Sequence, residues 1–108
     1  MYFKDIVNYI LKRPPMFVGD FELKSICNYM DGLGGYIHFN KIQDNTLEIY
    51  LKSFDKYVFL ELSKSNIEIR KYNECIGWVF LISQVEEDKM KRLELFSQLF
   101  NKFYDTYK

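Results

Sequence analysis

A rigid segment near the N-terminus, residues 12–19 (KRPPMFVG), most constrains how this chain can fold. Pro14 and Pro15 fix the backbone angle φ and lack an N–H donor, so a helix that arrives from the N-terminus must end just before them. Gly19 accepts backbone angles that other residues resist, which suits a sharp change of direction. The segment therefore predicts a stiff corner between two helices.

Helices are predicted on both sides of this corner. Before it, apolar residues recur at the spacing of one helical face over residues 2–12. After it, Asp20 is placed to act as an N-cap, and a second apolar stripe follows. Glycines at 32, 34 and 35 predict the end of the second helix, because glycine is the usual residue just beyond a helix C-terminus. The apolar positions of the two stripes are Phe3, Ile6, Val7, Ile10 and Leu11, then Leu23, Ile26, Cys27, Met30 and Leu33.

The middle of the chain changes to a period of two, which is typical of β-strands. Aliphatic residues alternate with polar or aromatic ones in short runs, and short polar segments separate the runs. This arrangement favours an antiparallel meander, in which the last run, apolar on both faces, is a strand that is central or covered on both sides. The predicted strands are residues 36–39, 47–52, 57–62, 67–70 and 75–82.

A long helix is predicted at the C-terminal end of the chain. Ser83 and Glu86 have the spacing of a capping box, and the acidic run 86–88 suits the positive end of a helix dipole. The apolar face of this helix comprises Leu93, Phe96, Phe100 and Phe103. The expected fold class is α+β: two short N-terminal helices, a four- to five-stranded antiparallel meander sheet, and a long C-terminal helix packed on the sheet. One domain over residues 1–108 accounts for this length.

The composition limits the function classes. Hydrophobic residues make up 48% of the chain and aromatic residues 19%, which excludes a disordered protein. The 15 Lys and Arg residues balance the 15 Asp and Glu residues, and a chain with no basic excess is not expected to bind nucleic acid directly. No apolar run approaches the ~20 residues that cross a bilayer, and no secretory signal is recognised. We therefore expect a cytoplasmic protein that does not bind membranes and keeps its cysteines reduced.

No residue pattern indicates an enzyme, a cofactor or a metal site. The single histidine, His38, lies in a predicted strand, where a structural role is more common than a catalytic one. Cys27 lies on an apolar stripe and is expected to be an inert thiol. Neither Cys27 nor Cys75 belongs to a metal-binding or redox motif. A solvated helix start explains the acidic run 86–88, and a dyad of Cys27 with His38 is the one enzymatic alternative that stays open.

Residues 13–32 contain a further pattern: an R-P-x-M-F-V-G corner, a helix with a serine, an aromatic residue and a D-G pair. Its residues are Arg13, Pro14, Pro15, Met16, Phe17, Val18 and Gly19, then Ser25, Ile26, Tyr29, Asp31 and Gly32. In this pattern the chain resembles short bacterial immunity proteins of polymorphic and contact-dependent growth inhibition toxin systems. It departs from them at Pro15, where glycine is usual, and at Phe17, where tyrosine is usual.

The resemblance covers about the first third of the chain. It implies an α+β fold and a protein that neutralises a cognate toxin by direct binding. It also implies that the corner motif builds the structure, whereas the variable remainder of the chain selects the partner. No family pattern is recognised beyond Gly35.

A binding surface is predicted on the side of the sheet that bears aromatic and charged residues. Tyrosine and arginine on a rigid platform are enriched in protein interfaces, and glutamates on this face would repel phosphates. A helix that covers this side would instead make the aromatic residues part of the core. The predicted partner-binding residues are Tyr50, Tyr57, Glu61, Glu68 and Tyr72.

The leading hypothesis is an immunity protein, not an enzyme, that binds a cognate toxin protein, a nuclease being one candidate. Carboxylates on such an inhibitor would take the place of phosphates. We expect a monomer or weak dimer that needs no cofactor. The first alternative is a small regulatory or ligand-binding domain that holds an apolar molecule. The second is a small enzyme that uses Cys27 or His38.

Overall fold

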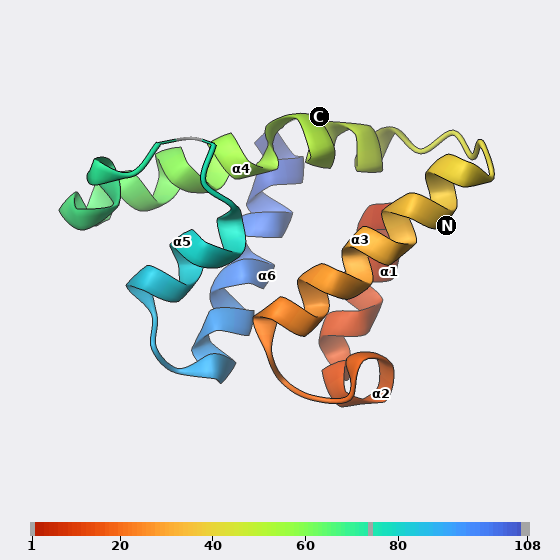
Figure 1. Ribbon diagram of the computed structural model, residues 1–108, viewed down its shortest axis with the longest axis horizontal. Coiled ribbons are helices and arrows are strands. Elements are labelled where there is room, and N and C mark those ends of the chain that lie inside the picture. Colours follow the sequence, from red (N-terminus) through yellow and green to blue (C-terminus); the bar gives the residue numbers. More distant parts are fainter. Residues whose placement is uncertain (1, 74, 107–108) are drawn as a thin grey trace.

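The computed structural model describes residues 2–73 and 75–106, and every regular element in this part of the chain is a helix (Figure 1). The predicted α+β fold with an antiparallel meander sheet was therefore wrong. The elements are α1 (Phe3–Lys12), α2 (Pro14–Val18), α3 (Leu23–Phe39), α4 (Asn45–Ser65), the 3₁₀ helix η1 (Ile67–Lys71), α5 (Trp78–Val85) and α6 (Lys89–Thr106).

The first helix and the break at the two prolines are confirmed. α1 ends at Lys12, and Arg13 leaves the helical conformation with φ −145°. Pro14 and Pro15 then occupy the first two positions of α2, where their missing N–H groups need no partner. Gly19 ends α2 with φ +85°, a left-handed conformation that favours glycine. The corner is therefore a short helix bounded by two sharp turns.

The second predicted helix is α3, which is longer than expected. It passes through the glycines at 32, 34 and 35 and ends at Phe39, so the predicted strand 36–39 is its last turn. A Cβ atom on Gly34 would lie 3.3 Å from Cδ1 of Leu47, so this glycine leaves room for the Leu47 side chain of α4. Asp20 does not cap α3 directly: its Oδ1 accepts from the backbone N–H of Glu22 at 2.9 Å and thereby shapes the preceding turn.

The predicted strands 47–52 and 57–62 form the single helix α4. Alternation of aliphatic residues suggested strands, but two of these residues on α4, Leu51 and Leu60, are 69% and 47% exposed. The buried side recurs every three or four residues, as a helix requires. Its members are Leu47, Tyr50, Phe54, Val58 and Leu62.

The last two predicted strands are also helical. Residues 67–70 lie in η1, where only Ile69 is buried. Most of the apolar run 75–82 lies in α5, which buries Trp78, Leu81 and Ile82 at helical spacing. The long C-terminal helix is confirmed as α6, but Ser83 does not begin it. The helix instead follows Asp88, whose Oδ1 accepts from the backbone N–H of Met90 at 2.9 Å.

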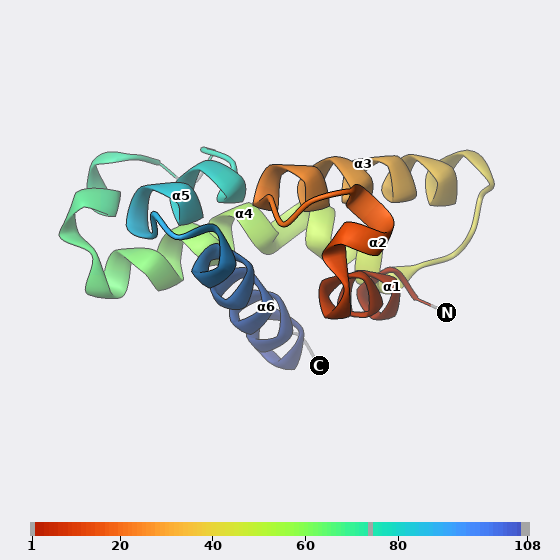
Figure 2. The same cartoon turned by 90° about the horizontal axis from the view of Figure 1, so that it is seen from below.

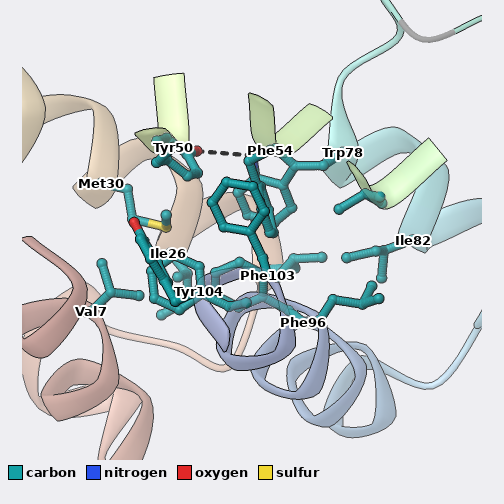
Figure 3. Packing of buried hydrophobic residues seen from close by; sticks show 14 of the residues in the cluster. Val7, Ile26, Met30, Tyr50, Phe54, Trp78, Ile82, Phe96, Phe103 and Tyr104 are labelled. Carbon is teal, nitrogen blue, oxygen red and sulfur yellow. Dashed lines mark hydrogen bonds between the residues drawn. The ribbon is translucent and has the colours of Figure 1, made fainter. Parts of the chain in front are cut away.

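The core is one cluster of buried aliphatic and aromatic side chains (Figure 3). α4 lies at its centre, in contact with α1, η1, α5 and α6, and α6 crosses α4 steeply (Figures 1 and 2). The ring of Phe54 on α4 lies within 6.0 Å of the ring of Tyr50 on the same helix and of the rings of four aromatic residues on α5 and α6. Trp78 stacks on Phe96 at 4.6 Å. These edge-on and stacked pairs add to the hydrophobic gain of burial. The neighbours of Phe54 on α5 and α6 are Trp78, Phe96, Phe100 and Phe103.

Candidate functional site

A groove between α3 and α4 forms a concave surface in the described part of the chain. The two helices diverge from the loop that joins them, and the start of α5 lies between them (Figure 1). The part of the groove that α5 closes has a volume of about 680 Å³, and a second part of about 350 Å³ continues towards the end of α3. Asp31, Tyr50 and Leu51 line both parts, so we treat them as one surface, called the α3/α4 groove.

Two hydrogen bonds fix the wall that α5 forms. The indole Nε1–H of Trp78 donates to the Tyr50 hydroxyl at 2.8 Å (Figure 3), and the backbone N–H of Trp78 donates to Oδ1 of Asp55 at 2.9 Å. Asp55, which lies on α4, thus provides an acceptor for the first N–H group of α5. Burial is the main cause that raises the pKa of Tyr50 well above its ordinary value. This wall is therefore preformed.

The groove combines apolar and acidic side chains. Leu51 is 69% exposed and Phe80 is 43% exposed, although both line the larger part. Asp31 and Glu48 are exposed at its border, and within the described residues neither of them forms an ion pair. Lys24 is the only lysine or arginine among the described residues that line either part. The groove therefore carries a net negative charge beside an apolar surface.

Cys27 lies in the larger part of the groove and is half-buried. Burial, together with the nearby carboxylates of Asp31 and Asp55, raises the pKa of the Cys27 thiol to about 11. The thiol is thus protonated near neutral pH and is a weak nucleophile. His38 follows Cys27 by 11 positions on the same helix, a rise of about 16 Å, so the two do not form a dyad. No group of three or more metal-ligating side chains occurs among the residues that the structure describes.

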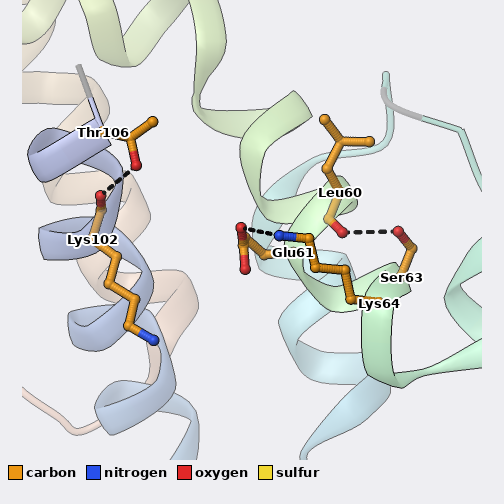
Figure 4. Close-up of polar contacts among 6 residues, drawn as sticks. All are labelled: Leu60, Glu61, Ser63, Lys64, Lys102 and Thr106. Atoms are coloured by element: carbon orange, nitrogen blue, oxygen red, sulfur yellow. Dashed lines mark hydrogen bonds and ion pairs between the residues drawn. The ribbon is translucent and has the colours of Figure 1, made fainter.

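The predicted partner-binding residues do not share one exposed face. The prediction of a common sheet face was wrong, because the described residues contain no sheet. Partner binding by these residues stays a prediction. Tyr50 is 8% exposed and belongs to the core. Tyr57 is half-buried, with its ring 5.4 Å from that of Phe103 on α6. Glu61 pairs with Lys64 on the same helix at 2.9 Å, in a region that also contains the C-terminal end of α6 (Figure 4).

The remaining two predicted residues lie on and after η1. Glu68 is exposed, and Tyr72 is half-buried. The Tyr72 ring packs edge-on against Phe80 at 5.2 Å, so Tyr72 supports a residue that lines the α3/α4 groove. Of the five predicted residues, only Tyr50 lines the groove itself.

The motif residues of the corner lie apart from the groove. Pro14 is buried, Phe17 packs against Tyr9 with ring centroids 5.5 Å apart, and Met16 is 72% exposed. The Ser25 hydroxyl donates to Oδ2 of Asp20 at 3.0 Å, which ties the start of α3 to the turn before it. Of the later motif residues, Asp31 does line the groove.

The sequence interpretation missed most of the groove residues. A signal was present, because Glu48, Leu51 and Asp55 have the i, i+3, i+7 spacing of one helical face. This common face was not recognised because the region was predicted to form strands, in which Leu51 and Glu48 would lie on opposite sides.

Comparisons with protein-family models, with curated proteins and with solved structures found no match to this chain. Among the described residues, no helix combines the length and the apolar character that a membrane span requires.

Proposed function

We propose that this chain is an immunity protein that binds a cognate bacterial toxin in the cytoplasm and blocks it by direct contact. The observation that supports this most is the α3/α4 groove, which is open, apolar and bordered by carboxylates without ion-pair partners. Exposed apolar side chains in such a concave, polar-rimmed surface are typical of a binding site for another protein. The pattern in residues 13–32 supplies the class of partner, because it resembles immunity proteins.

The charge of the groove favours a toxin whose contact surface is basic. Asp31, Glu48 and Asp55 present three carboxylates, against one lysine at Lys24. Carboxylates in such an arrangement attract lysine and arginine side chains and accelerate encounter with a basic partner. A nuclease, whose substrate is a polyanion, is one toxin with such a surface.

A growth assay tests this function. The toxin domains encoded beside the gene of this chain would be expressed in a bacterial host, each with and without the chain. We expect the chain to restore growth with one of them and to form a complex with that toxin in isothermal titration calorimetry. Toxins that arrest growth equally with and without the chain would overturn the proposal.

The groove also favours a second candidate, a domain that binds a small apolar molecule. Its larger part, about 680 Å³, is in the size range of small-molecule sites, roughly 300–1,000 Å³. Native mass spectrometry of the purified chain distinguishes the two functions. A bound small molecule that is lost in a Leu51→Lys variant would support the second candidate, whereas a chain of unmodified mass would contradict it.

A further inference from the structure

We infer that the α3/α4 groove is the docking site for a single amphipathic, basic helix of the partner protein. The inference rests on the proposed function only for the identity of that partner. It concerns the conformation, length and charge of the segment that the groove accepts.

The backbone of the groove walls decides the conformation of the bound segment. Both long walls are helices, α3 and α4, whose interior N–H and C=O groups already bond within each helix. An extended segment laid between them would bury its own N–H and C=O groups without partners, which is unfavourable. A helix satisfies these groups internally, and helices pack into the grooves between other helices.

The dimensions of the groove indicate the length of the segment. On α3 the lining residues extend from Lys24 to His38, a rise of about 21 Å. A helix of about 14 residues spans the same distance. Gly35 lines the part near the end of α3, and a Cβ atom placed there would have no neighbour within 4 Å. The backbone of α3 is therefore open to close approach at this point.

Apolar contacts would hold one face of the bound helix. Leu51 lines both parts of the groove and is mostly exposed, and Phe80 projects from the α5 wall. Phe54 and Trp78 lie behind them, and both are buried in the core. A rigid aromatic wall with exposed apolar groups in front of it has the character of an interface hot spot.

The negative charge of the groove favours basic side chains beside the apolar face of the bound helix. Asp31 borders the groove on α3, and Glu48 and Asp55 border it on α4. Lysine or arginine residues that flank the apolar face of the bound helix would meet these carboxylates on both sides. An acidic helix would meet like charges there, and like charges at an interface oppose binding.

A designed peptide tests the inference without the toxin. The probe is a 14-residue peptide of Leu, Ala and Lys with blocked ends and amphipathic helical spacing. Trp78, the only tryptophan, lines the groove, so its fluorescence reports binding of this non-fluorescent peptide. We expect a saturable change, at least tenfold weaker binding of a scrambled peptide of the same composition, and no binding of a version with Glu in place of Lys. Equal binding of all three peptides would overturn the inference.

Matched variants locate the site of binding. Asp31→Lys/Glu48→Lys should weaken peptide binding at least tenfold, whereas Glu68→Lys/Glu94→Lys, which changes the net charge equally outside the groove, should leave it within twofold. Leu51→Lys and Leu60→Lys form a second pair, because both leucines are exposed on α4 but only Leu51 lines the groove. Circular dichroism confirms that each variant is folded. Equal losses within each pair would contradict docking in the groove.

The same variants separate this inference from the proposed function. Rescue of growth by the native chain and by Leu60→Lys, but not by Leu51→Lys, supports both. Rescue by all three overturns the groove as the docking site and leaves the immunity function intact. Peptide binding in the groove without rescue from any toxin leaves the docking site intact and contradicts the immunity function. Self-association in sedimentation experiments that Leu51→Lys abolishes would show a second copy in the groove and overturn the inference.

Discussion

The carboxylate of Asp44 joins the start of α1 to the start of α4. Its Oδ2 accepts from the backbone N–H of Phe3, 41 residues earlier, at 2.7 Å. Its Oδ1 accepts from the backbone N–H groups of Thr46 and Leu47 at 3.1 and 3.2 Å. One side chain, only 4% exposed, thus satisfies orphan donors of two helices and places a negative charge at the positive ends of both dipoles.

Replacement of Asp44 should therefore destabilise the protein strongly. Asp44→Ala removes an N-cap and leaves the buried N–H of Phe3 without a partner, so the free energy of unfolding should fall by about 2–4 kcal/mol. Urea denaturation followed by circular dichroism measures this. Asp20→Ala is the matched control, because Asp20 caps an exposed turn and should cost about 1 kcal/mol or less. Equal losses for the two variants would show that the double cap contributes little.

The hydrogen bond between Trp78 and Tyr50 should contribute to both stability and the shape of the groove. Tyr50→Phe leaves the indole N–H of Trp78 without an acceptor in a buried site, so the free energy of unfolding should fall by about 1–3 kcal/mol. The Trp78 emission spectrum should change as well. Tyr9→Phe, at an exposed ring, is the control and should change neither quantity. Native stability of Tyr50→Phe would mean that another group satisfies the indole.

Cys27 should react slowly with alkylating reagents near neutral pH. Its thiol pKa of about 11, against an ordinary value of 9.0, leaves about 100-fold less thiolate at pH 7.5. Mass spectrometry after iodoacetamide treatment should therefore show modification of the exposed Cys75 first. The rate at Cys27 should rise steeply towards pH 11. Equal rates at the two cysteines at pH 7.5 would contradict the raised pKa.

The same pKa shift predicts a dependence of stability on alkaline pH. The folded chain holds the Cys27 proton more tightly than the unfolded chain does, so the thiol contributes stability below pH 9.0. This contribution should be lost as the pH rises from 9.0 towards 11. The Cys27→Ala variant should lose less stability over this interval than the native chain in urea denaturation. Parallel losses in both chains would assign the alkaline effect to other groups.

Substitutions of two glycines within α3 test the stability of this helix and the shape of the groove separately. Gly32 and Gly35 both have open space where a Cβ atom would lie, so Gly32→Ala and Gly35→Ala should each stabilise the helix by about 0.5–1 kcal/mol. Thermal denaturation measures this gain. Larger residues should distinguish the two sites: Gly35→Leu should weaken peptide binding, because Gly35 lines the groove, and Gly32→Leu should not. A loss of stability in both alanine variants would contradict the open surroundings.

The sequence alone determined the elements whose signals are local. The helix before Pro14, the sharp change of direction at Gly19 and the apolar face of α6 follow from steric limits on φ and from the 3.6-residue period. These signals do not depend on what the rest of the chain does, so they were predicted correctly.

The structure of the middle region was decided by tertiary packing. Aliphatic residues on both sides of α4 imitate the alternation of strands, and only burial separates the core residue Phe54 from the exposed Leu51. The sequence does carry one signal against hairpins in this region: residues 36–76 contain no glycine or proline, and tight hairpin turns depend strongly on glycine.

Most of the candidate site likewise could not be predicted from the sequence, whose one signal was the common helical face of Glu48, Leu51 and Asp55. The α3/α4 groove exists because α3 and α4 diverge beyond the contact of Gly34 with Leu47, and because α5 docks its first turn on Asp55. These contacts join residues that lie 13 and 23 positions apart. Their side-chain types reveal neither the divergence nor the docking, which depend on how the whole aromatic core packs. Local chemistry thus determined where several helices begin and end, and only the tertiary structure decided which of their faces remain open to a partner.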